Sequence, residues 1–251
     1  PHILLAVEYL PILRLAGPYF YFFSEKIVCC SSMVSRMFKK SDKVLVKYPG
    51  VDLNEFSPQV TGQNLRERLS VSASLVSMAT RLDKWKGVET FIKAARYVEH
   101  EAKFIIFAEL VLGKEKYLNK LENMIKRLRL DGKVFIKIAR CTPEVIAASD
   151  IIVHASLRPE PFGLVIIEAM AGGRTVIASN LGGPREIITN GVDGLLVEPG
   201  NPKALAAAIS DLLRNPKAAE EMGLKARGEA AKKFNLKEYT QSFDGIFHEG
   251  I

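Results

Sequence analysis

From about residue 75 onward, short apolar runs alternate with longer amphipathic segments. Six runs have the length and composition of buried strands: residues 74–80, 103–110, 133–138, 150–156, 174–179 and 194–199. Helical spacing of apolar residues marks the segments 88–99, 114–130 and 202–215. The last of these segments has Asn201 as its expected cap and Pro202 at its first position. This alternation predicts an α/β fold with a doubly wound parallel sheet, in which ligands bind beyond the carboxyl ends of the strands.

The first 60 residues follow a different pattern. Apolar runs at 2–8, 26–32 and 43–52, with one helical segment at 32–40, amount to about two strand-and-helix units. Because so few strands do not make a stable sheet domain, we interpret residues 1–60 as the end of a preceding α/β domain. The main domain is then 61–235, and 236–251 is expected to be a C-terminal helix that packs back on the N-terminal part. The polar stretch 57–70 is the predicted linker.

The composition favours a broad class of binding partners but does not identify one. The 251 residues are 48% hydrophobic and 25% charged, which is typical of a folded globular protein. A formal net charge of +7 favours anionic partners such as nucleotides or phosphates without choosing among them. Cys29, Cys30 and Cys141 form no CxxC pair, so a reducing cytosol is expected. The sequence starts at Pro1 rather than Met, and we expect that N-terminal sequence has been lost.

A basic loop contains the first group of candidate site residues. Arg81 and Lys86 flank the loop within residues 79–91, and Gly87 lets the backbone turn closely into the helix that follows. Two cations beside a helix N-terminus attract the same anion, which predicts a diphosphate site. A solvated basic loop is the alternative that the spacing leaves open.

Two glutamates in PEPFGLVIIEAM, residues 159–170, are the second group of candidate site residues. Glu168 lies in an apolar run where burial is costly unless a hydrogen bond compensates it. Glu160 precedes the predicted helix, which starts near Gly163, so both carboxylates can reach one cleft. Since a carboxylate accepts hydrogen bonds from vicinal hydroxyls, the pair could hold a sugar ring and a ribose. Alternatively, Glu160 is a solvated loop residue and Glu168 a helix-surface charge.

The segments TRLDKWKG, PEPFGLVIIEAMAGG, GGPREII and NGVDGLLVEPGN, in this order, resemble the nucleotide-sugar-binding domain of retaining glycosyltransferases of family 4. These enzymes have the GT-B architecture, built from two Rossmann-like domains. PGVDLNEFSP resembles the segment that closes their acceptor-side N-terminal domain, and the whole resemblance covers residues 25–247. It implies a retaining hexosyltransferase of carbohydrate biosynthesis that uses UDP-glucose or GDP-mannose and a carbohydrate or lipid-linked acceptor.

The resemblance also implies roles for residues. Two cations would bind the donor diphosphate, one carboxylate the transferred sugar and another the ribose, with help from backbone groups at the helix start. The implied catalytic residues are Glu160, Arg81 and Lys86, and the implied substrate-binding residues are Glu168, Phe162, Gly163, Leu164 and Arg140. No metal or cofactor is expected, because the two cations and the helix dipole already stabilise the leaving diphosphate.

The chain departs from the family pattern in several places. Thr80 stands where glycine is usual before the phosphate-binding arginine, and Ala139 and Arg140 replace a glycine after the strand 133–138. The N-terminal domain of the family commonly supplies a catalytic His. The corresponding place here holds Val7 or Glu8, whereas His2 lies at the other end of that strand.

Other functions remain as alternatives. A nucleotide-sugar-binding module without independent transferase activity would need a partner or a longer chain. A dinucleotide oxidoreductase would need GxGxxG after its first strand, which ATRLDKWKG lacks. Nucleic acid is not an expected partner, since only the net charge suggests it. The aromatic run 19–23 is expected to be buried at a domain interface, with peripheral contact at the cytoplasmic membrane face as the alternative to a purely cytoplasmic protein.

Overall fold

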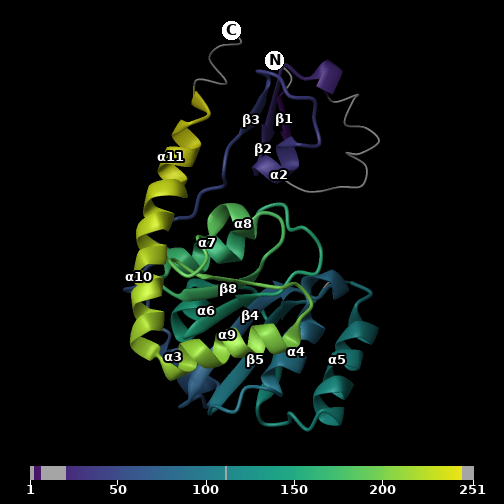
Figure 1. Ribbon diagram of the computed structural model, residues 1–251, viewed down its shortest axis with the longest axis vertical. Helices are drawn as coiled ribbons and strands as arrows, with labels where there is room; N and C mark the ends of the chain where they lie inside the picture. Colours follow the sequence, from purple (N-terminus) through teal and green to yellow (C-terminus); the bar gives the residue numbers. More distant parts are fainter. Residues whose placement is uncertain (1–2, 7–20, 111, 245–251) are drawn as a thin grey trace.

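The computed structural model describes residues 3–6, 21–110 and 112–244. These residues form two parallel sheets, one of three strands and one of six. The larger sheet and its helices make up the lower body in Figure 1, and the smaller sheet lies above it.

The six-stranded sheet is a doubly wound parallel sheet, as predicted. Its strands are β4 (Ser74–Arg81), β5 (Ala102–Glu109), β6 (Val134–Ile138), β7 (Ile151–His154), β8 (Thr175–Ser179) and β9 (Leu195–Val197). Each coincides with one of the six apolar runs. The order is β6-β5-β4-β7-β8-β9, so the order reverses between β4 and β7. Ligands of such sheets bind at this reversal, beyond the carboxyl ends of the strands.

Alternate residues of the strands face two separate cores. Val76 and Met78 of β4 belong to one buried cluster, while Leu75 and Ala79 belong to another. The first core is covered by the helices α4 (Val88–Ala95), α5 (Glu115–Arg127) and α9 (Pro202–Arg214). The second face is covered by α6 (Pro143–Ala148), α7 (Leu164–Ala171) and α10 (Pro216–Lys233). Asn201 caps α9 as predicted, because its side chain accepts hydrogen bonds from two backbone amides.

The small sheet consists of β1 (Ile3–Ala6), β2 (Lys26–Cys29) and β3 (Val44–Val46). The short helix α2 (Ser32–Ser35) lies between β2 and β3 in the chain. A carboxylate from the larger unit fixes this helix. Glu186, on α8 (Pro184–Ile187), accepts hydrogen bonds of 2.8 Å from the amides of Ser32 and Met33 and one of 3.0 Å from the Tyr48 hydroxyl. The two sheets are therefore joined at the N-terminus of α2.

The C-terminal helices run along both sheets. α10 packs on the larger sheet, and α11 (Leu236–Gln241) continues upward beside the smaller one (Figure 1). Val51 lies between them: its amide donates to Phe234 and its carbonyl accepts from Leu236. Helix α10 was not expected from the sequence, and residues 245–251 of the expected C-terminal helix lie outside the described residues.

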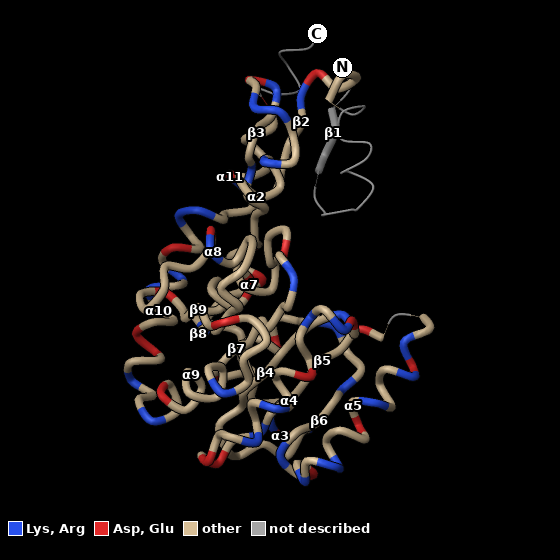
Figure 2. Tube along the Cα trace, turned by 45° about the vertical axis from the view of Figure 1, so that its right-hand side comes forward, with Lys and Arg blue, Asp and Glu red and all other residues tan. Residues whose placement is uncertain are grey.

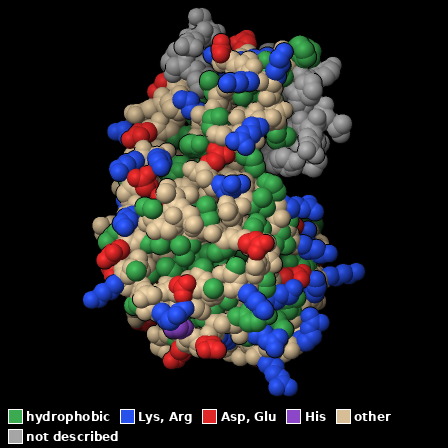
Figure 3. Space-filling model, in the orientation of Figure 1, with side chains coloured by type: hydrophobic (Ala, Val, Ile, Leu, Met, Phe, Trp, Pro, Cys, Tyr) green, Lys and Arg blue, Asp and Glu red, His purple; other side chains and the backbone are tan. Residues whose placement is uncertain are grey.

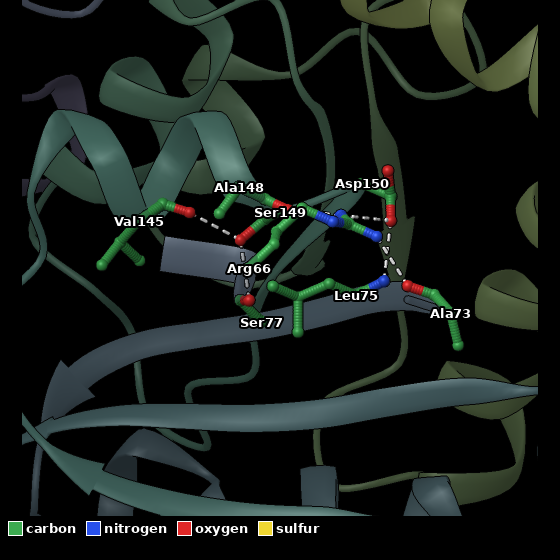
Figure 4. A network of polar contacts seen from close by, with 8 residues as sticks. All are labelled: Arg66, Ala73, Leu75, Ser77, Val145, Ala148, Ser149 and Asp150. Atoms are coloured by element: carbon green, nitrogen blue, oxygen red, sulfur yellow. Dashed lines mark hydrogen bonds and ion pairs between the residues drawn. The ribbon is translucent and has the colours of Figure 1, made fainter. Parts of the chain in front are cut away.

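The linker predicted over 57–70 is wrong in its second half, where helix α3 (Gln63–Arg68) packs on α6. Figure 4 shows the reason. The Arg66 guanidinium donates to the carbonyls of Ala148 (2.7 Å) and Ala73 (2.6 Å) and pairs with Asp150 (3.2 Å), whose carboxylate also accepts from the Leu75 amide. A polar side chain thus anchors a helix that looks like a linker by composition.

The aromatic run also differs from expectation in its described part. Phe22 is 79% exposed and Phe23 is 66% exposed, so burial at a domain interface is wrong for these two residues. No helix of the described residues is long and apolar enough to cross a bilayer.

Candidate active site

Three loops meet at the carboxyl edge of the larger sheet, where the strand order reverses. They follow β4, β7 and β8, and backbone hydrogen bonds tie them together. Leu157, after β7, donates to Trp85, after β4, at 2.7 Å, and Gly183, after β8, donates to Glu160 at 2.7 Å. These bonds make one rigid platform from segments that are far apart in the sequence.

Glycines are required where these loops touch. Gly87 has φ +77°, and a Cβ atom there would lie 1.8 Å from the Ala155 carbonyl oxygen. At Gly183 a Cβ atom would lie 2.3 Å from the carbonyl oxygen of Phe162. The motif glycines therefore serve close packing between loops at these two positions.

The carboxylate of Glu160 is the centre of a buried polar cluster. Its Oε2 atom lies 2.7 Å from Lys86 Nζ, 2.9 Å from Ser156 Oγ and 3.2 Å from His154 Nε2. Glu160 is 9% exposed, and His154 and Ser156 are buried. Burial alone would raise the pKa of Glu160, but the hydrogen bond and charge of His154 and those of Lys86 outweigh it and lower the pKa to about 2. Glu160 is therefore ionised.

The two predicted cations have different environments. The Lys86 side chain is 13% exposed, pairs with Glu160 and lies over the Trp85 ring at 4.2 Å from its centroid. Arg81, the last residue of β4, is exposed, and its side chain has no ion-pair partner among the described residues. Lys86 is therefore part of the buried cluster, while Arg81 presents its charge at the edge of the sheet.

Glu168 lies on α7 and contacts a different strand end. Its carboxylate lies close enough to the thiol of Cys141, which follows β6, for each group to shift the pKa of the other. Burial raises the pKa of Glu168, and the nearby carboxylate of Glu55 raises it further, whereas the Cys141 hydrogen bond lowers it. Burial also raises the pKa of Cys141, which stays a neutral thiol that can donate. The two glutamates thus face different loops of the same edge.

The remaining predicted residues divide into two groups. Phe162 is buried against the rings of Tyr48 and Phe234, so only its backbone can reach a ligand. Gly163 has φ +118° at the start of α7, and Leu164 is exposed there. The amides at this helix start have no partner within the helix and can face an anion.

Arg140 is not part of the Glu160 cluster. It is 85% exposed in its side chain and pairs with Glu109, at the end of β5, at 3.1 Å. Arg140 follows β6, where the family usually has a glycine, and its side chain therefore forms a surface ion pair at this position. His2, Val7 and Glu8, considered for the missing catalytic His, lie outside the described residues.

Sequence reasoning missed His154 and Ser156. The signal was present, because residues i and i+2 at the end of a strand point to the same side and both precede Glu160. No group of three His, Cys, Asp or Glu side chains in the described part of the chain is arranged to hold a metal ion.

Positive charge is spread over several elements rather than gathered at this edge. Basic residues occur along α5 and at the ends of α9 and α10, and in the view of Figure 3 they gather on the side where α5 lies (Figures 2 and 3). Net charge alone therefore does not identify the binding face.

Comparison with known proteins gives consistent matches. The family model for Glycosyl transferases group 1 matches residues 66–229, well over half of the chain. Spore coat protein SA of Bacillus subtilis (strain 168) is 30% identical over 237 residues, which are 87% of this chain and 62% of that protein. D-inositol 3-phosphate glycosyltransferase of Paenarthrobacter aurescens (strain TC1) is 31% identical over 198 residues, which are 76% and 48% of the two chains. The chain spans about half to three fifths of the length of these curated relatives.

A solved structure extends the likeness to both sheets. HepE of Anabaena, crystallised in complex with UDP-glucose, has a TM-score of 0.93 and 26% identity, covering 99% of this chain and 72% of that chain. The predicted GT-B type of doubly wound sheet is confirmed by this similarity.

Proposed function

Because the chain belongs to the glycosyl transferases of group 1, we propose that it binds a nucleoside-diphosphate sugar and transfers its hexose, with retained anomeric configuration, to a carbohydrate or lipid-linked acceptor. The observation that carries the proposal is the buried Lys86–Glu160 pair at the reversal of strand order. The pair supports the proposal because its cation can bind a phosphate and its ionised carboxylate can bind a sugar hydroxyl.

The donor diphosphate would lie between Arg81, Lys86 and the amides at the start of α7. An ammonium group has three donors, so Lys86 can keep its bond to Glu160 while it donates to a phosphate oxygen. Lys86 then stands at the junction between the sugar and the diphosphate, and Arg81 provides the second cation from the end of β4.

The ribose would lie at Glu168, on the side of the site where the loop after β6 begins. This carboxylate, beside the Cys141 thiol, can accept bonds from two vicinal ribose hydroxyls. Arg140, which directly precedes Cys141, pairs with Glu109 on the same edge, and the base of the nucleotide would lie on this side of the ribose.

In the proposed reaction the acceptor hydroxyl attacks the anomeric carbon from the face that the nucleotide leaves. The glycosidic bond forms as the bond between sugar and phosphate breaks, and the hydroxyl proton passes to the departing diphosphate. Arg81 and Lys86 stabilise the charge that develops on the diphosphate. Because these cations and the helix amides perform this task, the proposed reaction uses no metal or cofactor.

Two donors are in contention. HepE was crystallised with UDP-glucose, which supports a uridine nucleotide, and GDP-mannose is the second candidate that the family resemblance offers. Calorimetric titration with UDP-glucose, UDP and UMP, and with GDP-mannose, GDP and GMP, tests both. We expect the diphosphate to bind at least about tenfold more tightly than the monophosphate, since each charge-assisted bond contributes roughly 1.5 to 3 kcal/mol.

Equal affinity for the monophosphate and diphosphate of both bases would overturn the assignment of the site. Arg81→Ala should weaken UDP or GDP binding, whereas Arg96→Ala, which changes another exposed arginine at the end of α4, should not. Release of nucleoside diphosphate that depends on an added acceptor supports transfer. Binding without such release supports the alternative, a nucleotide-sugar-binding module.

Peripheral membrane contact is a further part of the proposal. The exposed rings of Phe22 and Phe23 support it, because aromatic side chains insert readily at the boundary between headgroups and acyl chains. Co-sedimentation with vesicles of phosphatidylcholine and phosphatidylglycerol tests it. Equal sedimentation of the parent chain and of the Phe22→Ser, Phe23→Ser double variant would contradict this role.

A further inference from the structure

We propose that His154 and Ser156 are positioning residues: they hold Glu160 so that one of its oxygens faces the sugar of the donor. The inference rests on the proposed function, because it assigns how the sugar-binding carboxylate is oriented. Neither residue belongs to the set that the family resemblance implies.

The contacts of Glu160 are divided unequally between its two oxygens. All three neighbours, Lys86, Ser156 and His154, contact Oε2. Within the described residues Oε1 accepts no hydrogen bond, yet it is not among the fully buried polar atoms that lack a partner. Oε1 is therefore the oxygen that stays accessible to a ligand hydroxyl.

The three neighbours differ in how firmly they can hold this orientation. Lys86 reaches Glu160 through a flexible four-carbon stem, and a bound diphosphate attracts the same ammonium group. His154 ends strand β7 and Ser156 follows two residues later, so both are placed by the sheet. When Lys86 divides its donors between Glu160 and the phosphates, His154 and Ser156 are the neighbours whose position does not depend on the bound diphosphate.

The burial of His154 supports a role at this position rather than in general packing. Its Nε2 lies 3.2 Å from Glu160 and 3.3 Å from Ser156 Oγ, whereas its Nδ1 is buried without a partner. An unpaired buried nitrogen costs stability, so a histidine serves here through the contacts that it makes at Nε2.

The Ser156 hydroxyl completes the arrangement. It donates to Oε2 at 2.9 Å and lies within reach of His154 Nε2, so the three groups form a closed triangle. With the imidazole proton on Nε2, both His154 and Ser156 donate to the same carboxylate oxygen. The lone pairs of Oε1 remain for the donor sugar.

The test is the gain in affinity that the sugar brings, measured as the ratio of dissociation constants for UDP and UDP-glucose, and for GDP and GDP-mannose. His154→Leu and Ser156→Ala should lower this ratio about tenfold for the donor that the parent chain prefers, because the oriented carboxylate is lost. Their affinity for the bare diphosphate should change less than twofold, since its contacts are with Arg81 and Lys86.

Conservative and control variants separate positioning from a structural effect. His154→Gln keeps an N–H donor and should restore most of the ratio. Two control variants should leave the ratio unchanged. Ser179→Ala changes a buried serine at the end of the neighbouring strand β8, and His100→Leu changes a histidine just before β5, at the amino edge of the sheet. If His154→Leu does not fold, Ser156→Ala and His154→Gln still decide the matter.

Several outcomes overturn the inference. Unchanged ratios in His154→Leu and Ser156→Ala, or equal losses for the bare diphosphate and the nucleotide sugar, would show that these residues do not orient Glu160. A parent chain that binds neither UDP nor GDP would instead refute the proposed function itself, so the two failures are distinguishable.

Discussion

Replacing Gly87 by alanine tests the loop platform that carries the active site. Gly87 has φ +77° and Gly132 has φ +78°, so the same substitution imposes the same backbone strain at both positions. The surroundings differ: a Cβ atom at Gly87 would lie 1.8 Å from the Ala155 carbonyl oxygen, whereas one at Gly132 would meet nothing within 4 Å. Gly132→Ala is therefore the matched control.

The expected magnitudes follow from this difference. A left-handed conformation costs a residue other than glycine roughly 1 to 2 kcal/mol, which is the whole expected effect at Gly132. At Gly87 the carbonyl must also move, and overpacking of this kind adds about 1 to 3 kcal/mol. We expect urea unfolding to show a loss of roughly 2 to 5 kcal/mol for Gly87→Ala and roughly 1 to 2 kcal/mol for Gly132→Ala.

The same experiment has a functional readout. Ala155 directly precedes Ser156, so moving its carbonyl shifts the segment that positions Glu160, and Gly87→Ala should also weaken nucleotide-sugar binding. Equal destabilisation by the two variants, with nucleotide-sugar binding intact in both, would refute the argument that close loop contact requires glycine at Gly87.

Three further outcomes are expected. Glu186→Ala removes the acceptor for two amides of α2 and should lower the free energy of unfolding by about 2 kcal/mol in urea titrations. Glu168→Gln should weaken binding of nucleotide and nucleotide sugar alike, whereas Glu160→Gln should mainly reduce the gain from the sugar; equal losses in calorimetry would contradict their separate roles. The folded pKa of Glu160 lies below its usual value of 4.5, at about 2, so its contribution is present above pH 4.5 and is lost as pH falls toward 2. Unfolding of Glu160→Gln should depend less on pH across that window, and an unchanged dependence would refute the assignment.

The sheet could be predicted from the sequence because its signals are local. The four central strands, β4, β5, β7 and β8, bury runs of apolar residues on both faces, and the turns between strands and helices carry their own markers, such as the cap at Asn201. The proximity of Lys86 and Glu160 also follows once the strand order is known, since the loops after β4 and β7 flank the reversal.

Other features depend on contacts that no local pattern displays. Helix α10 buries the small residues Gly223, Ala226 and Ala230, so its apolar stripe has little contrast. Helix α3 is anchored by Arg66, whose partners include the Ala148 carbonyl and the Asp150 carboxylate, 82 and 84 residues further along the chain. Phe162 looks exposed beside glycine but is enclosed by Tyr48 from the N-terminal part, a neighbour that only the tertiary fold supplies.

Charged side chains have different contacts at the two ends of the larger sheet, and the difference indicates which end binds a ligand. At the amino end, Arg66 satisfies the carbonyls of Ala148 and Ala73 and pairs with Asp150, which also accepts from a backbone amide, so these charges are used within the fold. At the carboxyl end, Glu160 has one oxygen that accepts no hydrogen bond from any described residue.

Replacing a buried ion pair with apolar residues often costs little stability, so the Lys86–Glu160 pair is weakly explained by stability alone. The donors to Glu160 are Lys86, from the loop after β4, and His154, at the end of β7. Ligands of doubly wound sheets bind between two such strands, where the strand order reverses. A carboxylate held on one oxygen by three donors, with the other oxygen accessible, is organised to receive a hydroxyl group. The contacts of Glu160 therefore favour binding of a polar ligand over a purely structural role for the cluster.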